Sequence, residues 1–155
     1  MTNFLQLIDE QHVKTNLLVS SKKALFENIS KHVCGLHPSL ADEDLVCALI
    51  QREKLGTTSI GSGIAIPHCR LLHCTKSILG LFTLEQPIIY NDDNHKVDLI
   101  ALLLVPESEH EEHLQLLSEF VQRLGTPQIQ KDLRLAQTSQ QALTALLRQP
   151  STQFG

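Results

Sequence analysis

Two stretches in the first third of the chain carry apolar residues at the three- and four-residue spacing of a helix. The first follows Ser20 and Ser21, either of which can cap a helix, and Gly35 is predicted to end it. The second follows Ser39, opens with acidic residues that suit the helix dipole, and is predicted to end at Gly56. The apolar positions of these two predicted helices are Leu25, Phe26, Ile29, Val33, Leu45, Leu49 and Ile50.

The longest apolar runs lie in the middle of the chain, at residues 78–84 and 97–105, and both are predicted to be strands. Residues 99–105 are apolar without interruption. This pattern is typical of a strand that is buried on both faces, so helices should cover both faces of the sheet. Three shorter strands are predicted, at residues 4–8, 16–19 and 64–66.

The segment between the two long strands, residues 85–96, is polar and rich in turn-forming residues, so it is predicted to be a connection. Helical spacing returns after Pro106, in a helix that begins near residues 109–112 and is broken at Gly125. Two shorter helices are predicted after it, at residues 127–135 and 139–148, the latter capped by Ser139.

This order of helices, strands and helices predicts one layered domain of the α/β (or α+β) class over residues 1–155. The folded core should span about residues 4–148, and the tail at residues 149–155 should be loose. A chain of 155 residues suits a single domain. Because only 4% of the residues are aromatic, the core must consist mostly of aliphatic side chains.

Composition and charge exclude several functional classes. The net charge of −4 and the scattered Lys and Arg residues lack the basic footprint of a nucleic-acid-binding protein. The longest apolar run is far shorter than the ~20 residues of a spanning helix, so membrane insertion is not expected. The N-terminus does not resemble a secretory signal, and the spacing of the four cysteines matches no disulfide framework. We therefore expect reduced thiols and a cytoplasmic location.

Among eight histidines, His68 has the most informative setting. It follows a predicted buried strand and Pro67, which restricts the backbone just before the imidazole. Gly61 and Gly63 precede that strand and could let backbone N–H groups approach an anion. Imidazole is partly unprotonated at neutral pH, so it can accept a phosphoryl group and release it again. From the residues alone, an ordinary hydrogen-bonded histidine is the more common case and remains the alternative interpretation.

Two other residues could complete a phosphoryl site. Arg52 ends the second predicted helix, and a guanidinium can hold phosphate oxygens in a fork. His113 lies in the first turn of the helix after Pro106, where the dipole and free N–H groups favour anions. The alternative for Arg52 is a solvated helix end or an ion pair with a neighbouring acid, and for His113 a plain exposed side chain.

Metal and nucleotide sites are weaker interpretations. The side chains of His68, Cys69, His73 and Cys74 are all types that bind zinc. However, adjacent residues of an extended strand point to opposite faces, so His68 and Cys69 should diverge. The glycine-rich segment lacks the Gly-Lys-Ser/Thr sequence of a phosphate-binding loop, and it precedes a strand, unlike a dinucleotide-binding fingerprint.

The sequence also resembles a known family. Residues 52–56 read REKLG, residues 61–68 read GSGIAIPH, and residues 111–117 read EEHLQLL. These motifs resemble the type-2 enzyme IIA domains of the bacterial phosphotransferase system, which include the mannitol, fructose and nitrogen-regulatory types. Residues 84–88 and 105–117 are most similar to the nitrogen-regulatory branch, and the resemblance extends over residues 4–147.

The resemblance implies a mixed β-sheet flanked by helices and a site that needs neither metal nor cofactor. It implies that His68 is the phosphorylated residue, as tele-phosphohistidine, that His113 is the second active-site histidine, and that Arg52 lies beside the phosphoryl group. The donor would be a phosphorylated HPr-like carrier, charged from phosphoenolpyruvate through an enzyme I. The phosphorylation state would control binding to target proteins such as kinases or transporters. No feature of the sequence indicates an oligomeric state.

The chain departs from the family pattern at a few positions. Cys69 stands where the motif usually has glycine, and it could restrict access to His68 or make the site redox-sensitive. Asn91 stands where the branch often has aspartate, and Cys74 is outside the pattern. Two alternative functions therefore remain: a sugar-specific fructose or mannitol IIA component, and an interaction module that transfers no phosphoryl group.

Overall fold

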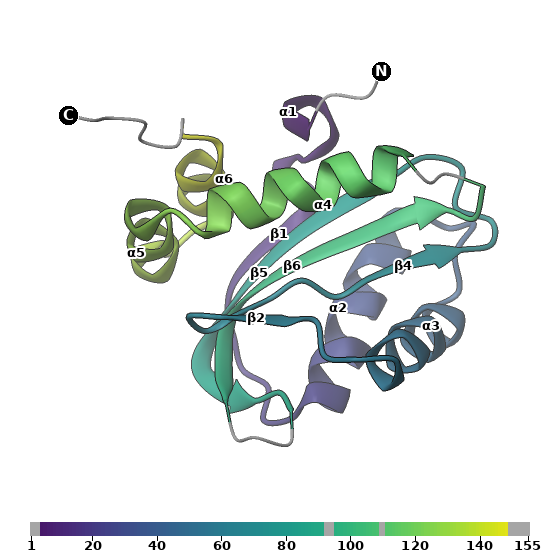
Figure 1. The fold of residues 1–155 in the computed structure, drawn as a ribbon, viewed down its shortest axis with the longest axis horizontal. Coiled ribbons are helices and arrows are strands. Elements are labelled where there is room, and N and C mark those ends of the chain that lie inside the picture. Colours follow the sequence, from purple (N-terminus) through teal and green to yellow (C-terminus); the bar gives the residue numbers. More distant parts are fainter. Residues whose placement is uncertain (1–3, 92–94, 109–110, 149–155) are drawn as a thin grey trace.

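Six strands form one mixed sheet in the computed structural model, which describes residues 4–91, 95–108 and 111–148 (Figure 1). The strand order is β1-β5-β6-β3-β2, and β4 also pairs with β6. β5 and β6 run antiparallel at the centre, while β1 is parallel to β5, and β3 and β4 are parallel to β6. The strands are β1 (Val13–Leu17), β2 (Ser59–Gly61), β3 (Ile64–Ala65), β4 (His68–Leu71), β5 (Ile78–Ile89) and β6 (Lys96–Pro106).

Helices cover both faces of the sheet, as the apolar pattern predicted (Figure 1). α2 and α3 pack on one face, and α1, α4, α5 and α6 pack on the other. The helices are α1 (Phe4–Leu7), α2 (Lys22–Leu36), α3 (Asp42–Lys54), α4 (Glu111–Leu124), α5 (Pro127–Leu135) and α6 (Ser139–Leu147), with a short 3-10 turn η1 (Glu10–His12) before β1. Within the described residues, no helix is long and apolar enough to cross a membrane.

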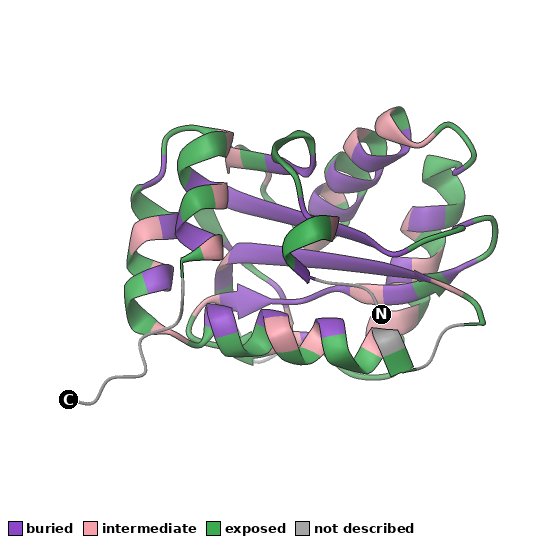
Figure 2. Cartoon of the chain, turned by 90° about the horizontal axis from the view of Figure 1, so that it is seen from above, coloured by how far each residue is buried: buried purple, intermediate pink, exposed green. Residues whose placement is uncertain are grey.

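The alternation of side chains along β6 divides the core into two clusters. Ile100, Leu102 and Leu104 pack beneath α2 and α3, whereas the intervening side chains, among them Leu99 and Leu103, pack beneath α4, α5 and α6. All of these side chains are fully buried, and Figure 2 shows the buried strands between helices whose outer surfaces are exposed. The continuous apolar run of β6 therefore contributes side chains to both core clusters.

Several predicted elements match closely. Ser21 caps α2, with its side chain accepting a hydrogen bond from the N–H of Ala24 at 3.1 Å. The bounds of α5 agree with the predicted 127–135. β1 begins three residues before the predicted strand at 16–19, and the cap of α6 is Thr138, because the hydroxyl of Ser139 donates instead to the carbonyl of Val13.

Three other predictions were wrong. The strand predicted at residues 4–8 is absent, and Phe4–Leu7 form α1, in which Phe4 packs edge-on against Phe120 of α4 with the ring centroids 5.0 Å apart. Gly35 does not end α2, which continues to Leu36 and is capped by His37. The connection predicted at 85–96 is shorter, because β5 continues to Ile89 and there pairs with Lys96 of β6.

Candidate functional site

His68 is the first residue of β4, directly after Pro67, so it begins a strand that the sequence analysis did not predict. Pro67 accepts a hydrogen bond from the N–H of Leu103 at 3.1 Å, and β4 then runs parallel to β6. Successive side chains of β4 face opposite sides of the sheet, so His68 is half-buried on the α4 side, whereas Cys69 is buried in the cluster beneath α2 and α3. The expected divergence of these two side chains is confirmed.

The ring of His68 is held by its own backbone segment. Its Nδ1 lies 2.6 Å from the carbonyl oxygen of Ile66, and since a carbonyl can only accept, Nδ1 carries the proton. In the neutral ring, Nε2 therefore presents the lone pair. This tautomer makes Nε2 the nucleophilic atom, in agreement with the tele position that the family resemblance implied.

The surroundings of His68 favour the neutral imidazole. Burial is the largest cause that lowers the pKa of His68 below the usual value of 6.5, and the charge of Arg52 lowers it further. The hydrogen bond to Ile66 and the charge of Glu53 act in the opposite direction and raise it. Because the net shift is downward, more of the ring is unprotonated, and hence nucleophilic, at neutral pH.

His113 lies against His68, although the two residues are separated by a strand hairpin in the sequence. It is the third residue of α4, and its ring centroid is 5.2 Å from that of His68, with an angle of 71° between the ring planes. Its position in the first turn of α4 adds the helix dipole and backbone N–H groups to this side of the site. The structure thus brings together the two histidines that the sequence analysis singled out.

Arg52 lies in the last turn of α3, the helix that packs on the face of the sheet opposite α4. Its Nη1 donates to the carbonyl of Gly56 at 2.9 Å, and its charge acts on the imidazole of His68. The ion pair with a neighbouring acid that was considered for Arg52 is not seen among the described residues, and the adjacent Glu53 pairs with Lys22 at 3.2 Å. The site therefore combines one side chain each from α3, β4 and α4.

The sequence analysis missed the role of Glu53, whose carboxylate is only 7% exposed. It accepts hydrogen bonds from the N–H of Thr58 at 3.0 Å and from the Thr58 hydroxyl, and the Tyr90 hydroxyl lies 3.2 Å away. Together with the ion pair to Lys22, these contacts fix the end of α3 against β5 and the segment that leads into β2. The available signal was an acidic residue in the last helical turn, where the dipole disfavours it.

The glycines before β3 do not lie at the His68 site, contrary to expectation. Gly61, with a φ of 95°, ends β2, and Gly63, with a φ of 79°, lies in the turn that leads to β3. A Cβ on Gly63 would lie 2.6 Å from Nη2 of Arg134, which donates to the carbonyl of Ser62. The carbonyl of Gly63 pairs with β6 four residues before the position that pairs with Pro67, about 13 Å away along the strand.

The side chains of the considered His-Cys cluster do not converge. His73 is exposed, whereas Cys69 and Cys74 are buried in the core cluster beneath α2 and α3. Burial raises the pKa of the Cys69 thiol to about 12, so it stays protonated. Because Cys69 points away from the imidazole, it does not narrow the approach to His68.

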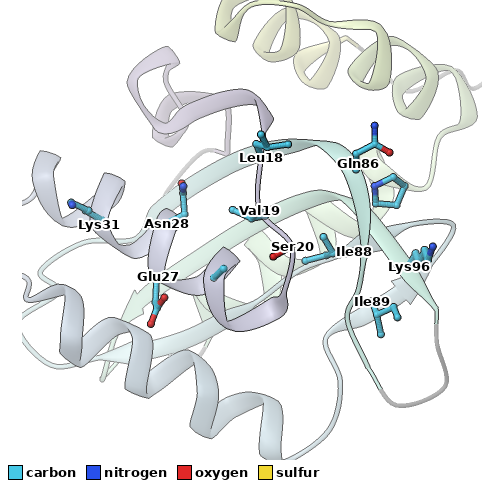
Figure 3. Close-up of a pocket in the computed structure, with 12 residues that line it drawn as sticks. Leu18, Val19, Ser20, Glu27, Asn28, Lys31, Gln86, Ile88, Ile89 and Lys96 are labelled. Carbon is cyan, nitrogen blue, oxygen red and sulfur yellow. The ribbon is translucent and has the colours of Figure 1, made fainter.

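A hollow of about 820 Å³ lies elsewhere on the molecule, between α2 and the outer part of β5 (Figure 3). Val19 and Ile88 line its apolar part, and Lys31 and Lys96 lie at its edge. None of the residues at the His68 site lines this hollow. The His68 site, where side chains of α3, β4 and α4 meet, is thus separate from this hollow.

Comparisons with known proteins agree with this geometry. Residues 6–149 match the family model described as "Phosphoenolpyruvate-dependent sugar phosphotransferase system, EIIA 2". The nitrogen regulatory protein of Pseudomonas aeruginosa is 37% identical over 136 residues, which cover 87% of this chain and 88% of that protein.

Solved structures give the same result. The nitrogen regulatory protein IIA-Ntr from Neisseria meningitidis superposes with a TM-score of 0.84 and 30% identity, over 92% of this chain and 97% of that one. The mannitol IIA of Escherichia coli superposes with a TM-score of 0.73 at 16% identity, over 90% of this chain and 98% of that one, and shares the fold. This chain therefore belongs to the type-2 enzyme IIA family of the phosphoenolpyruvate-dependent phosphotransferase system, and its relatives include several nitrogen regulatory proteins.

Proposed function

We propose that Nε2 of His68 accepts a phosphoryl group from the phosphohistidine of an HPr-like carrier protein, and that target proteins recognise whether the group is present. The observation that carries this proposal is the hydrogen bond from Nδ1 to the carbonyl of Ile66, which leaves Nε2 as the nucleophile. The carrier would be charged from phosphoenolpyruvate through an enzyme I, and the targets would be proteins such as kinases or transporters.

The transfer exchanges one N–P bond for another. The lone pair of His68 Nε2 attacks the phosphorus in line while the N–P bond of the donor breaks, and its electron pair returns to the donor imidazole. Nδ1 of His68 keeps its proton throughout, because it remains bonded to the carbonyl of Ile66. The transition state is loose and carries its charge on three phosphoryl oxygens, so the protein acts mainly by position and charge.

Arg52 and His113 are suited to neutralise those oxygens from two sides. The guanidinium of Arg52 needs only to exchange its bond with the Gly56 carbonyl for a stronger, charge-assisted bond to an anion. His113 contributes a ring next to His68 and the positive end of α4. A phosphoryl group adds about two negative charges beside His68, and a partner can detect this change of charge.

Exposed apolar side chains near the site would form the docking surface. Leu55 follows α3 and is 84% exposed, and Leu114 follows His113 and is 66% exposed. Ile60, which we expected to contribute, is 46% exposed, but Ile64, the other expected contact, is only 1% exposed and cannot take part. If a partner docks on these exposed apolar side chains, Arg52 and His113 remain to contact the phosphoryl oxygens.

The test is phosphorylation of the full chain with enzyme I, an HPr-like carrier and phosphoenolpyruvate, followed by intact-mass analysis. We expect the mass of one phosphoryl group to be added, and to be lost in acid, as is usual for phosphohistidine. His68→Ala should gain no mass, whereas His73→Ala, which alters an exposed histidine five residues away, should behave like the wild type. Full phosphorylation of His68→Ala would refute the assignment.

Regulation requires a second measurement. Wild-type protein in its phosphorylated and unphosphorylated forms should capture different partners, and His68→Ala should behave as the unphosphorylated form with or without donor. If both forms of the wild type bind the same partners equally, the regulatory role is wrong even where phosphorylation itself is observed.

A further inference from the structure

His12 and His37 form a second pair of imidazoles, apart from the pair of His68 and His113. His12 ends η1, and His37 caps α2, with its backbone N–H bonded to the carbonyls of Val33 and Cys34. The two Nε2 atoms face each other at 2.8 Å, and the ring centroids are 5.0 Å apart. Both residues are therefore held by the ends of regular elements, which fixes their rings in place.

A carboxylate holds the opposite side of one ring. Oδ1 of Asp9 lies 2.7 Å from Nδ1 of His12, and it also accepts the N–H of Gln11 at 3.0 Å. Nδ1 of His12 therefore carries a proton, and Nε2 of His12 offers a lone pair toward His37. This is the arrangement of a metal-bound histidine, in which a carboxylate orients the ring and increases the basicity of the coordinating nitrogen.

We infer that His12 and His37 form a binding site for a zinc-type divalent cation, with both Nε2 atoms as ligands and Asp9 as the carboxylate that orients His12. His37 becomes a ligand when its proton moves from Nε2 to Nδ1, so the cation requires no net loss of protons from the pair. Imidazole nitrogens bind zinc at about 2.0–2.1 Å, which for a tetrahedral ion places the two nitrogens about 3.3 Å apart. The observed 2.8 Å needs to increase by only about 0.5 Å.

The site is open and not a closed structural centre. In the described part of the chain, no group of three or more His, Cys, Asp or Glu side chains could hold a metal ion, so this protein supplies two ligands. Water or a small external ligand would complete the coordination, as in zinc sites that keep an exchangeable position. His12 is 8% exposed, whereas His37 is half-buried, so the cation would enter from the His37 side.

Zinc chloride titrated into the full chain and followed by calorimetry tests this inference. We expect binding at the pair in the wild type and its loss in His12→Gln and in His37→Gln. Asp9→Asn keeps an oxygen acceptor for Nδ1 but removes the charge, so it should weaken binding by about 10–100-fold. His32→Gln is the matched control, because its Nε2 contacts the carbonyl of Gln11 and not another imidazole.

One further variant and one further measurement test whether zinc binds at the His12–His37 pair. His68→Gln should leave zinc binding at the pair intact, since the ring of His68 belongs to the other histidine pair. Zinc should raise the unfolding temperature of the wild type and not that of His37→Gln, whose half-buried position makes it the variant least prone to misfolding. The inference fails if the wild type binds no zinc, if binding persists in both His12→Gln and His37→Gln, or if it is lost only in His68→Gln.

Discussion

The positive charge of Arg52 acts on the imidazole of His68, and this makes the titration of His68 a direct test of the site. The pKa of His68 should lie below 6.5, chiefly because of burial. Arg52→Ala removes a cause that lowers the pKa, so the midpoint should move upward. NMR of the labelled imidazole measures both values. An unchanged midpoint in Arg52→Ala, with Arg148→Ala as the control for loss of a surface arginine, would place Arg52 outside the site.

His113 should affect the rate of phosphoryl transfer more than the fold. Its ring is 5.2 Å from that of His68, and loss of one group that stabilises transition-state charge typically costs about 100-fold or more in rate. The His113→Ala variant should therefore accept the phosphoryl group from the carrier about 100-fold more slowly, as measured by rapid quench. Its circular dichroism spectrum should be unchanged. A wild-type rate in this variant would remove the proposed role of His113.

At the level of residues, the sequence was sufficient to single out the three side chains proposed to contact the phosphoryl group, and insufficient for the residues that support them. Arg52, His68 and His113 follow from motif and chemistry. The contact between Glu53 and Tyr90 joins residues 37 positions apart, which only the folded sheet brings together. Gly63 was misread because a glycine that makes room for Arg134 looks the same in the sequence as one that makes room for an anion.

At the level of elements, Gly35 provides a simple test. It lies inside α2 with no left-handed backbone angle, and a Cβ built on it would meet nothing within 4 Å. Gly35→Ala should therefore stabilise the protein by about 0.5–1 kcal/mol, since alanine loses less backbone entropy in a helix. Urea unfolding measures the change. A destabilised variant would mean that Gly35 does end the helix, as we first predicted from the sequence.

The elements that the sequence predicted well are those with a long, regular pattern. α2, α5 and β6 have periodic or continuous apolar positions, and Ser21 caps α2, so the local sequence is enough to predict these elements. β3 lies within the predicted strand at residues 64–66, but β2 and β4 were not predicted, because they contain only three and four residues and form by pairing with β3 and β6. α1 was mistaken for a strand because four residues are too few to show a period, and its contact with α4 decides its form.

At the level of the whole molecule, the carboxylate of Glu53 connects four separate parts of the chain. It joins the start of α2 through Lys22, the segment before β2 through Thr58, and the end of β5 through Tyr90, while its own helix carries Arg52. Burial is the main cause that raises the pKa of Tyr90, so its hydroxyl stays protonated as a donor. We therefore expect the position of Arg52 at the His68 site to depend on these contacts of Glu53, which lie outside the site.

Glu53→Gln tests this dependence. The amide keeps one acceptor oxygen but cannot pair with Lys22 or satisfy all the donors, so we expect a loss of about 1–3 kcal/mol in the free energy of unfolding. We also expect slower phosphoryl acceptance by the folded fraction, because α3 no longer holds Arg52 in register with His68. Tyr90→Phe removes only one hydroxyl from the network and should give a smaller change in both quantities. If Glu53→Gln loses stability while the folded protein accepts phosphate at the wild-type rate, the network supports the fold alone and does not position the site.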